Sequence, residues 1–257
     1  MLVPLQAVKL KINGRCMNSC RFCVFHSRDE LLELADVQRV VEALGEHWRG
    51  QVILNGGEPT IHPRFVEIAE GLNAMAPGLR RGLGTNLRLF EAHRPTRQRE
   101  WCTVISCFSL VQVGCDDEHA NIDIVELRVP ELRAEGLEVY INCLDGYYSA
   151  RTRDRLLALD ARVGSRTRFS SPLVHANFSA DKPHPDARYL CDKRRREVLI
   201  DCDGSIYFCF HQEFIEPAGN LHHLDWRPLA DLLLLGAPER PYRACAACPY
   251  RAGGGVL

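Results

Sequence analysis

The chain of 257 residues has almost no net charge and no long apolar run. Its formal charge of −1 gives no electrostatic reason to expect binding to nucleic acid or to an anionic membrane. No apolar stretch approaches the roughly 20 residues that a transmembrane helix needs, and residues 1–6 lack the basic region and apolar core of a signal peptide. We therefore expect a cytoplasmic protein, with no membrane and no nucleic acid among its partners.

Cysteine, in contrast, is abundant, with 12 residues. In a reducing compartment this number favours metal or redox chemistry over disulfides. Apolar residues make up 46% and charged residues 25% of the chain, as in an ordinary globular protein. The length is enough for one large domain, or for one large and one small domain. Two groups of cysteines have the spacing of metal ligands: Cys16, Cys20 and Cys23, and then Cys191, Cys209, Cys245 and Cys248.

The first group has the spacing C-x3-C-x2-C and directly follows residues 7–12, whose alternating pattern predicts a strand. Thiolates are soft ligands that suit iron–sulfur clusters, zinc or copper. An ordinary [4Fe–4S] cluster takes four thiolates, so three would leave one iron open for a small molecule. The alternative is a structural zinc site, which usually takes four ligands in closely spaced pairs and fits this spacing poorly.

With Phe22 just before its last cysteine, this loop resembles the cluster loop of radical S-adenosylmethionine (SAM) enzymes. The resemblance implies that the amino and carboxylate groups of SAM bind the open iron. It also implies that the reduced cluster cleaves SAM to a 5′-deoxyadenosyl radical, which abstracts a hydrogen atom from the substrate. Phe22 would lie near the adenine, and an external one-electron donor such as flavodoxin or ferredoxin would reduce the cluster.

Three further motifs extend the resemblance. The run Gly56, Gly57 and Glu58 resembles the GGE motif, whose backbone binds the SAM amino group in this family. Adjacent glycines let the backbone approach a ligand closely and adopt positive φ. Asn86 resembles a SAM contact after the third strand, and Ser109 resembles a ribose contact at the end of the fourth, although the Asp expected two residues later is replaced by valine. As isolated residues they also fit ordinary turns.

Strands alternate with helices over the first two thirds of the chain, which predicts a parallel sheet with right-handed crossovers and ligands at the carboxyl ends of the strands. The resemblance makes this α/β fold an open, partial (β/α)6 radical SAM barrel, over residues 1–178. We expect strands at 7–12, 51–54, 79–84, 103–111, 137–144 and 166–174, and helices at 29–48, 63–75, 94–101, 121–135 (broken or kinked at Pro130) and 151–163.

Residues 179–257 are expected to form a small α+β domain. Asp203-Gly204 between two apolar runs indicates a hairpin, and a helix is expected over 226–235. The second group of cysteines could bind zinc or a second [4Fe–4S] cluster. The pattern resembles the Twitch domain, a shortened SPASM extension of radical SAM enzymes, and this resemblance implies one auxiliary [4Fe–4S] cluster for electron transfer, held by Cys191, Cys209, Cys245 and Cys248.

Other residues are less specific. Cys107 and Cys143 fall in expected strands, where a thiol usually packs as a small apolar group. Cys115, after the fourth strand, is a candidate hydrogen-atom donor, and packing is the simpler interpretation. Four arginines near the later strands could meet an anionic or polyol substrate, or several of them could be solvated charges on a helix face: Arg151, Arg153, Arg166 and Arg168. No histidine is singled out as a general base.

The resemblance covers nearly the whole chain and favours an enzyme that oxidises a small polyol or aminocyclitol, with the auxiliary cluster as electron acceptor. Radical SAM enzymes that crosslink peptides are an alternative, and a peptide would then be the substrate. A third possibility is a radical epimerase of a sugar or aminocyclitol, with Cys115 as hydrogen donor. The alternative outside enzymes is a zinc-binding module.

Overall fold

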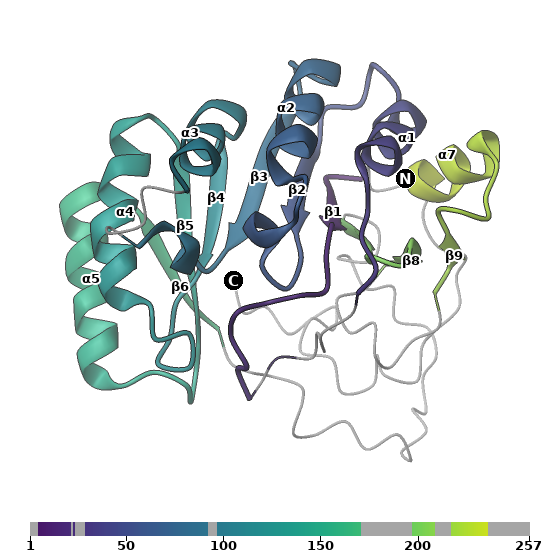
Figure 1. The fold of residues 1–257 in the computed structure, drawn as a ribbon. Coiled ribbons are helices and arrows are strands. Elements are labelled where there is room, and N and C mark those ends of the chain that lie inside the picture. Colours follow the sequence, from purple (N-terminus) through teal and green to yellow (C-terminus); the bar gives the residue numbers. More distant parts are fainter. Residues whose placement is uncertain are drawn as a thin grey trace, which may run out of the picture.

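The computed structural model describes residues 5–21, 23, 29–91, 97–170, 197–208 and 217–235. Within these residues a single nine-stranded sheet has the order β6-β5-β4-β3-β2-β1-β7-β8-β9 (Figure 1). The elements are β1 (Ala7–Lys11), α1 (Leu34–Leu44), β2 (Gln51–Asn55), η1 (Pro59–Ile61), α2 (Phe65–Met75), β3 (Arg80–Thr85), η2 (Arg88–Phe90), α3 (Gln98–Cys107), β4 (Leu110–Gly114), α4 (Ile122–Ala134), β5 (Glu138–Leu144), α5 (Ala150–Val163), β6 (Arg166–Ser170), β7 (Glu197–Ile200), β8 (Ser205–Tyr207), β9 (Gly219–Asn220) and α7 (Trp226–Leu235).

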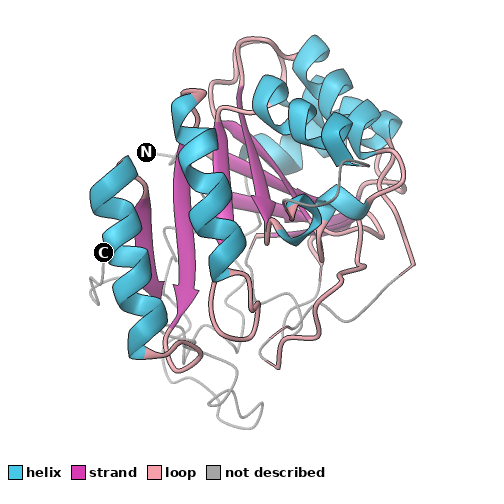
Figure 2. Cartoon of the chain, turned by 60° about the vertical axis from the view of Figure 1, so that its left-hand side comes forward, coloured by secondary structure: helices cyan, strands magenta, loops and turns pink. Residues whose placement is uncertain are grey.

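The first six strands pair in chain order and all run parallel, as the alternation of strands and helices predicts. The sheet is open, because its end strands β6 and β9 do not pair with each other in the described part of the chain. The helices lie against one face of the curved sheet (Figure 2). This α/β architecture agrees with a partial barrel, and the carboxyl ends of β1 to β6 meet at one edge.

Alternation along the strands separates two faces of the sheet. The outer face, toward the helices, carries wholly buried apolar residues such as Leu10, Leu54, Leu83, Val113 and Ile141, which join the main core cluster. The inner face is apolar at Ile53 and Leu110 and polar farther along the strands. There the register places a row of side chains from five strands, interrupted at Gly84 of β3: Lys11, Asn55, Gln112, Tyr140 and Arg166.

Helix α1 is shorter than residues 29–48 because both its ends are capped. The backbone N–H of Glu33 donates to Asp36 Oδ2 at 2.8 Å, which starts the helix. Gly45, with φ of 75°, ends it. Of the two effects expected from Pro130, a break or a kink, the break is wrong, because α4 continues through this residue to Ala134.

The largest correction concerns residues 103–111, for which we expected a strand. Most of this stretch belongs to α3, and β4 starts only at Leu110. Trp101, Val104 and Cys107 are buried at a spacing of three residues, which is helical, so the apolar face of α3 imitates a buried strand. Cys107 therefore packs at the end of a helix, whereas Cys143 lies in β5 as expected.

The hairpin at Asp203-Gly204 is confirmed: β7 and β8 are antiparallel, and Gly204 has φ of 81°. Strand β7 also pairs in parallel with β1, so the described parts of the two expected domains share one sheet. The expected boundary at residue 178 lies outside the described residues. Helix α7 has its expected bounds and packs beside α1 (Figure 1). None of the described helices has the length and apolar character to cross a membrane.

Candidate functional site

The cysteine loop leaves the carboxyl end of β1, as predicted. Cys16, Cys20 and Cys23 are all partly exposed, and none forms a disulfide. The loop turns on itself, since the N–H of Cys23 donates to Cys20 O at 3.0 Å. The N–H of Asn18 points at Cys16 Sγ, at 3.4 Å. Phe22 lies outside the described residues.

The Gly56-Gly57 pair lies directly against the segment that leads into this loop. The N–H of Gly57 donates to Asn13 O at 3.0 Å, and the N–H of Glu58 donates to Arg15 O at 2.8 Å. A Cβ on Gly57 would lie 2.2 Å from Arg15 O, and one on Gly56 would lie 2.7 Å from Asn13 O. Neither glycine has positive φ. The structure therefore requires them for close backbone contact and not for a left-handed conformation.

Glu58 is fully buried and its carboxylate accepts four hydrogen bonds. Oε1 accepts from the Thr60 hydroxyl at 2.7 Å, the Thr60 N–H at 3.2 Å and the Thr85 hydroxyl at 2.8 Å, and Oε2 accepts from the Asn86 N–H at 2.7 Å. Burial raises the pKa of Glu58, and its four donors act in the opposite direction. The side chain thus joins the ends of β2 and β3 and has no exposed surface for a ligand.

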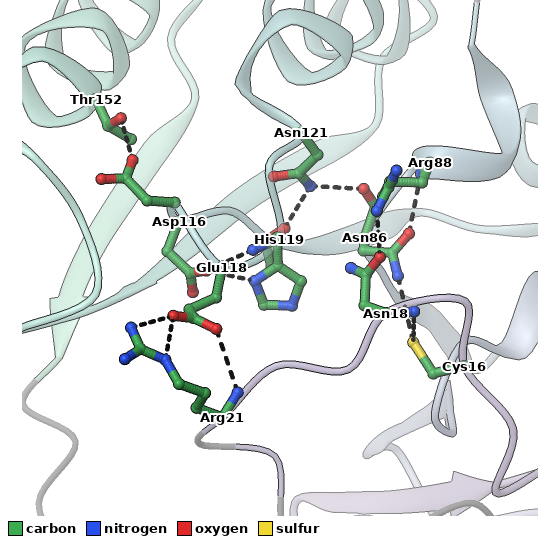
Figure 3. A network of polar contacts seen from close by, with 12 residues as sticks. Cys16, Asn18, Arg21, Asn86, Arg88, Asp116, Glu118, His119, Asn121 and Thr152 are labelled. Carbon is green, nitrogen blue, oxygen red and sulfur yellow. Dashed lines mark hydrogen bonds and ion pairs between the residues drawn. The ribbon is translucent and has the colours of Figure 1, made fainter.

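Asn86 is buried at the end of β3, and its side chain reaches the cysteine loop. Its Nδ2 donates to Cys16 Sγ at 3.7 Å, while its Oδ1 accepts the N–H of Arg88 at 2.9 Å (Figure 3). Arg88 Nη1 in turn donates to Asn18 Oδ1 at 2.6 Å. Residues that follow the third strand therefore contact the cysteine loop at two points.

The loop after β4 closes the site from the other side, and our sequence analysis missed it. Glu118 accepts from Arg21 Nε at 2.7 Å and from the Arg21 N–H at 3.3 Å, within the cysteine loop. Asn121 Nδ2 donates both to Asn86 O at 2.6 Å and to Gly114 O at 2.8 Å (Figure 3). The signal that could have predicted these contacts was the polar run 116–121, which directly follows the fourth strand. Because that strand was expected to end at residue 111, the run was not placed at a strand end.

In the same loop, Asp116 is buried and its Oδ1 lies 2.9 Å from His119 Nδ1. Asp116 Oδ2 is also buried, and it has no hydrogen-bond partner among the described residues. Burial raises the pKa of Cys16, and burial together with the nearby Asp116 raises that of Cys20 to about 11. These thiols are therefore protonated at neutral pH without a ligand, and metal binding releases their protons.

Two expected site residues lie elsewhere. Ser109 precedes β4, so it lies at the amino end of the sheet, opposite the cysteine loop, and its hydroxyl donates to Arg81 O at 3.2 Å. The expected ribose contact is therefore wrong. Cys115 is fully buried in the core cluster, where burial raises the pKa of its thiol. Packing accounts for Cys115, and a role as hydrogen-atom donor does not fit a thiol without exposed surface.

The second group of predicted ligands, Cys191, Cys209, Cys245 and Cys248, lies outside the described residues. Of the C-terminal cysteines, Cys202 is described, and it is buried with its pKa raised to about 12 by burial. In the part of the chain that the structure describes, no three His, Cys, Asp or Glu side chains converge on one point suitable for a metal ion. Thiolates of a cluster bind separate irons, so the partly exposed Cys16, Cys20 and Cys23 suit a cluster better than a single ion.

Residues 10–106 match the radical SAM superfamily. This part of the chain is therefore similar to radical SAM domains. The match starts in β1, includes the cysteine loop, the GGE motif and Asn86, and ends in α3. A radical SAM domain implies SAM and a [4Fe–4S] cluster as cofactors, together with a substrate and a reductant. It also identifies the chain as an enzyme.

Relatives support the same assignment over a limited length. A probable GTP 3′,8-cyclase of Methanothermobacter thermautotrophicus is 35% identical over 74 residues, which are 27% of this chain and 24% of the relative. The GTP 3′,8-cyclase of Actinobacillus succinogenes is 31% identical over 74 residues, 26% of this chain and 22% of that protein. The chain thus matches about a quarter of the length of these curated relatives.

Solved structures agree in fold. SuiB of Streptococcus suis, bound to the precursor peptide SuiA, gives a TM-score of 0.66 at 13% identity, covering 91% of this chain and 65% of SuiB. Native anSMEcpe with bound AdoMet and a Cp18Cys peptide gives 0.59 at 14% identity, covering 95% of this chain and 94% of that one. At such identities the likeness concerns the fold alone.

Proposed function

We propose that this chain is a radical SAM oxidoreductase that oxidises a carbinol carbon of a small polyol or aminocyclitol. The observation that carries its radical chemistry is the network joining the cysteine loop, the GGE motif and Asn86 at the carboxyl ends of three neighbouring strands. Cys16, Cys20 and Cys23 would hold a [4Fe–4S] cluster with one iron left for SAM. When bound, the cluster and SAM supply the 5′-deoxyadenosyl radical that removes a hydrogen atom from the substrate.

The residues around the loop have separate tasks in this proposal. The close contact of Gly56 and Gly57 with residues 13–16 brings the backbone of the GGE motif to the start of the cysteine loop. Asn86 donates a hydrogen bond to Cys16 Sγ, and donors to a ligating sulfur stabilise its negative charge and thereby favour the reduced cluster. The Arg21–Glu118 pair keeps the loop closed toward β4.

Net oxidation needs more than hydrogen abstraction. Converting a carbinol to a ketone removes one hydrogen atom, one proton and one further electron. We assign the electron to an auxiliary [4Fe–4S] cluster held by Cys191, Cys209, Cys245 and Cys248, in a Twitch domain within residues 179–257. This assignment is supported by the sequence pattern of the four cysteines.

Two other substrates should be tested beside a polyol or aminocyclitol: GTP and a precursor peptide. The relatives named GTP 3′,8-cyclase match only part of this chain, so their substrate is not transferred, and GTP belongs in any substrate panel. The fold likeness to SuiB makes a precursor peptide the second candidate. Radical epimerisation loses its proposed hydrogen donor, because Cys115 is buried.

The first test measures iron, sulfide and 5′-deoxyadenosine after anaerobic reconstitution under reductant. About eight irons per chain with SAM cleavage would support two [4Fe–4S] clusters, and about four would remove the electron acceptor. Zinc without SAM cleavage would exclude the enzymatic proposal. Cys16→Ala should abolish SAM cleavage and retain about four irons, whereas Cys245→Ala should keep SAM cleavage and lose product oxidation. Circular dichroism of both variants controls for unfolding, because cluster binding is coupled to folding.

A further inference from the structure

The inner face of the sheet carries a pair of cations at its β6 edge. Tyr140 and Asn142 alternate with the buried Val139, Ile141 and Cys143, so their side chains lie on the inner face. Arg166 pairs with Tyr140 and Arg168 with Asn142 in the register of β5 and β6. Both arginines therefore belong to the inner face, and both are exposed. They are not charges on a helix face, which was one interpretation of the sequence.

These two cations have no carboxylate partner among the described residues, although arginines nearby do. Arg80 pairs with Glu138, and Arg155 pairs with Asp123 and Glu126. Arg166 and Arg168 instead lie over the ring of Tyr140, with their Cζ atoms 5.8 and 4.4 Å from its centroid. Their backbone positions are about 6.6 Å apart along the strand, so two like charges lie close together, with no ion pair to a carboxylate in the described part of the chain.

The surrounding inner face suits a polar, anionic molecule. Gln112 and Asn142 contribute amides in neighbouring register positions, between the arginines and the strands that carry the site. Lys11, at the other end of the row, pairs with Asp201 at 2.9 Å. Glu138, at the amino end of β5 on the same face, accepts a hydrogen bond from the Tyr140 hydroxyl at 3.4 Å, and its charge is paired with Arg80. A substrate with its anionic group at β6 would thus extend past the amides of Asn142 and Gln112 toward the cysteine loop.

We propose that Arg166 and Arg168 together bind an oxyanion of the substrate, a phosphate or a carboxylate. Two guanidinium groups fixed on one aromatic ring provide forked donors for such a group, and charge-assisted bonds of this kind are the stronger class of hydrogen bond. The inference narrows the substrate of the proposed oxidoreductase to anionic derivatives, and to that extent it rests on the proposed function. The anion site itself is defined by β5 and β6 alone.

The test compares Arg166→Gln and Arg168→Gln with Arg153→Gln. Arg153 is a matched control because it lies on α5 and stacks on Phe169 of the same strand, at 5.8 Å, from the outer face. Each variant removes one positive charge. Binding of inorganic phosphate and of citrate to the reconstituted enzyme is measured by isothermal titration calorimetry, and the tighter probe indicates the class of oxyanion.

We expect each inner-face variant to raise the Kd at least about tenfold and Arg153→Gln to leave it within about twofold. Equal weakening in all three variants, or no binding by the unaltered enzyme up to about 10 mM of either probe, would overturn the anion site. 5′-Deoxyadenosine formation is measured on the same samples. If SAM cleavage fails while the binding pattern holds, the proposed function is wrong and the anion site stands.

Discussion

Replacing Gly57 with alanine tests whether the GGE motif works by backbone contact. The added Cβ would lie 2.2 Å from Arg15 O, 2.5 Å from Arg15 C and 3.0 Å from Cys16 N. All three atoms belong to the backbone, so no side-chain rotation can relieve the overlap. The segment before the cysteine loop must move away from β2, and the Gly57–Asn13 and Glu58–Arg15 hydrogen bonds lengthen or break.

The size of the effect follows from these contacts. Loss of two hydrogen bonds removes about 1–3 kcal/mol, and the overlap itself costs about 1–3 kcal/mol. We therefore expect Gly57→Ala to lower the free energy of unfolding by about 2–6 kcal/mol. For a chain of this size that corresponds to a fall in Tm of about 4–24 °C.

Gly78→Ala is the matched control, because a Cβ at Gly78 has no neighbour within 4 Å and its φ is not positive. Its stability should stay within about 1 kcal/mol of the parent chain. Urea denaturation and iron content after reconstitution are measured for both variants. We expect Gly57→Ala to lose cluster loading from the first site together with stability. If both variants matched the parent in stability and in iron, the close-contact argument would be refuted.

Three further variants test single side chains of the described structure. Glu58→Gln leaves at least one buried donor without an acceptor, so it should cost about 1–3 kcal/mol in urea denaturation, while the exposed Glu70→Gln should cost almost nothing. Asp201→Asn breaks the buried pair with Lys11 and should cost about 3–5 kcal/mol near neutral pH. Burial by itself raises the pKa of Asp201, but the charge and hydrogen bond of Lys11 together with the hydrogen bonds of Cys202 outweigh it and lower the pKa below its ordinary value of 3.8. The contribution of this pair to stability is therefore present above pH 3.8, and the two chains should converge in stability as the pH falls below it. Cys115→Ser should leave 5′-deoxyadenosine and product formation unchanged, and a loss of product with SAM cleavage intact would restore the hydrogen-donor role.

The sequence predicted those parts of the site that depend on short, continuous motifs. The cysteine loop, the Gly56-Gly57-Glu58 run and Asn86 each follow a strand directly, and parallel strands bring such positions to one edge. The hairpin at Asp203-Gly204 was predictable for the same reason, because its short turn between Asp201 and Ser205 needs a residue with positive φ, which Gly204 supplies.

What the sequence did not reveal depends on contacts between distant segments. The apolar residues within 98–107 are also compatible with a buried strand. The helix becomes evident only from the burial of Trp101, Val104 and Cys107, which are three residues apart. Because of that error, the fourth strand was expected to end at residue 111, with Ser109 near its carboxyl end. Asp116, Glu118 and Asn121, which follow the strand in the structure, were therefore not predicted as site residues. The pairing of β7 with β1 has no local signal either, because it joins segments far apart in the sequence; Lys9 and Glu197, whose side chains form a hydrogen bond across it, are 188 positions apart.

That pairing has a practical consequence for anyone preparing fragments of this protein. A piece ending near residue 178 would contain every motif of the radical SAM domain, yet it would lack β7. Strand β1 would then offer a row of unpaired backbone groups to solvent, and unpaired edges of this kind promote aggregation. Lys11 would lose Asp201 at the same time, within five residues of Cys16. Residues 197–201 therefore support the strand that leads into the cysteine loop, and we expect a fragment that ends near residue 178 to be less stable and more prone to aggregation than the full chain.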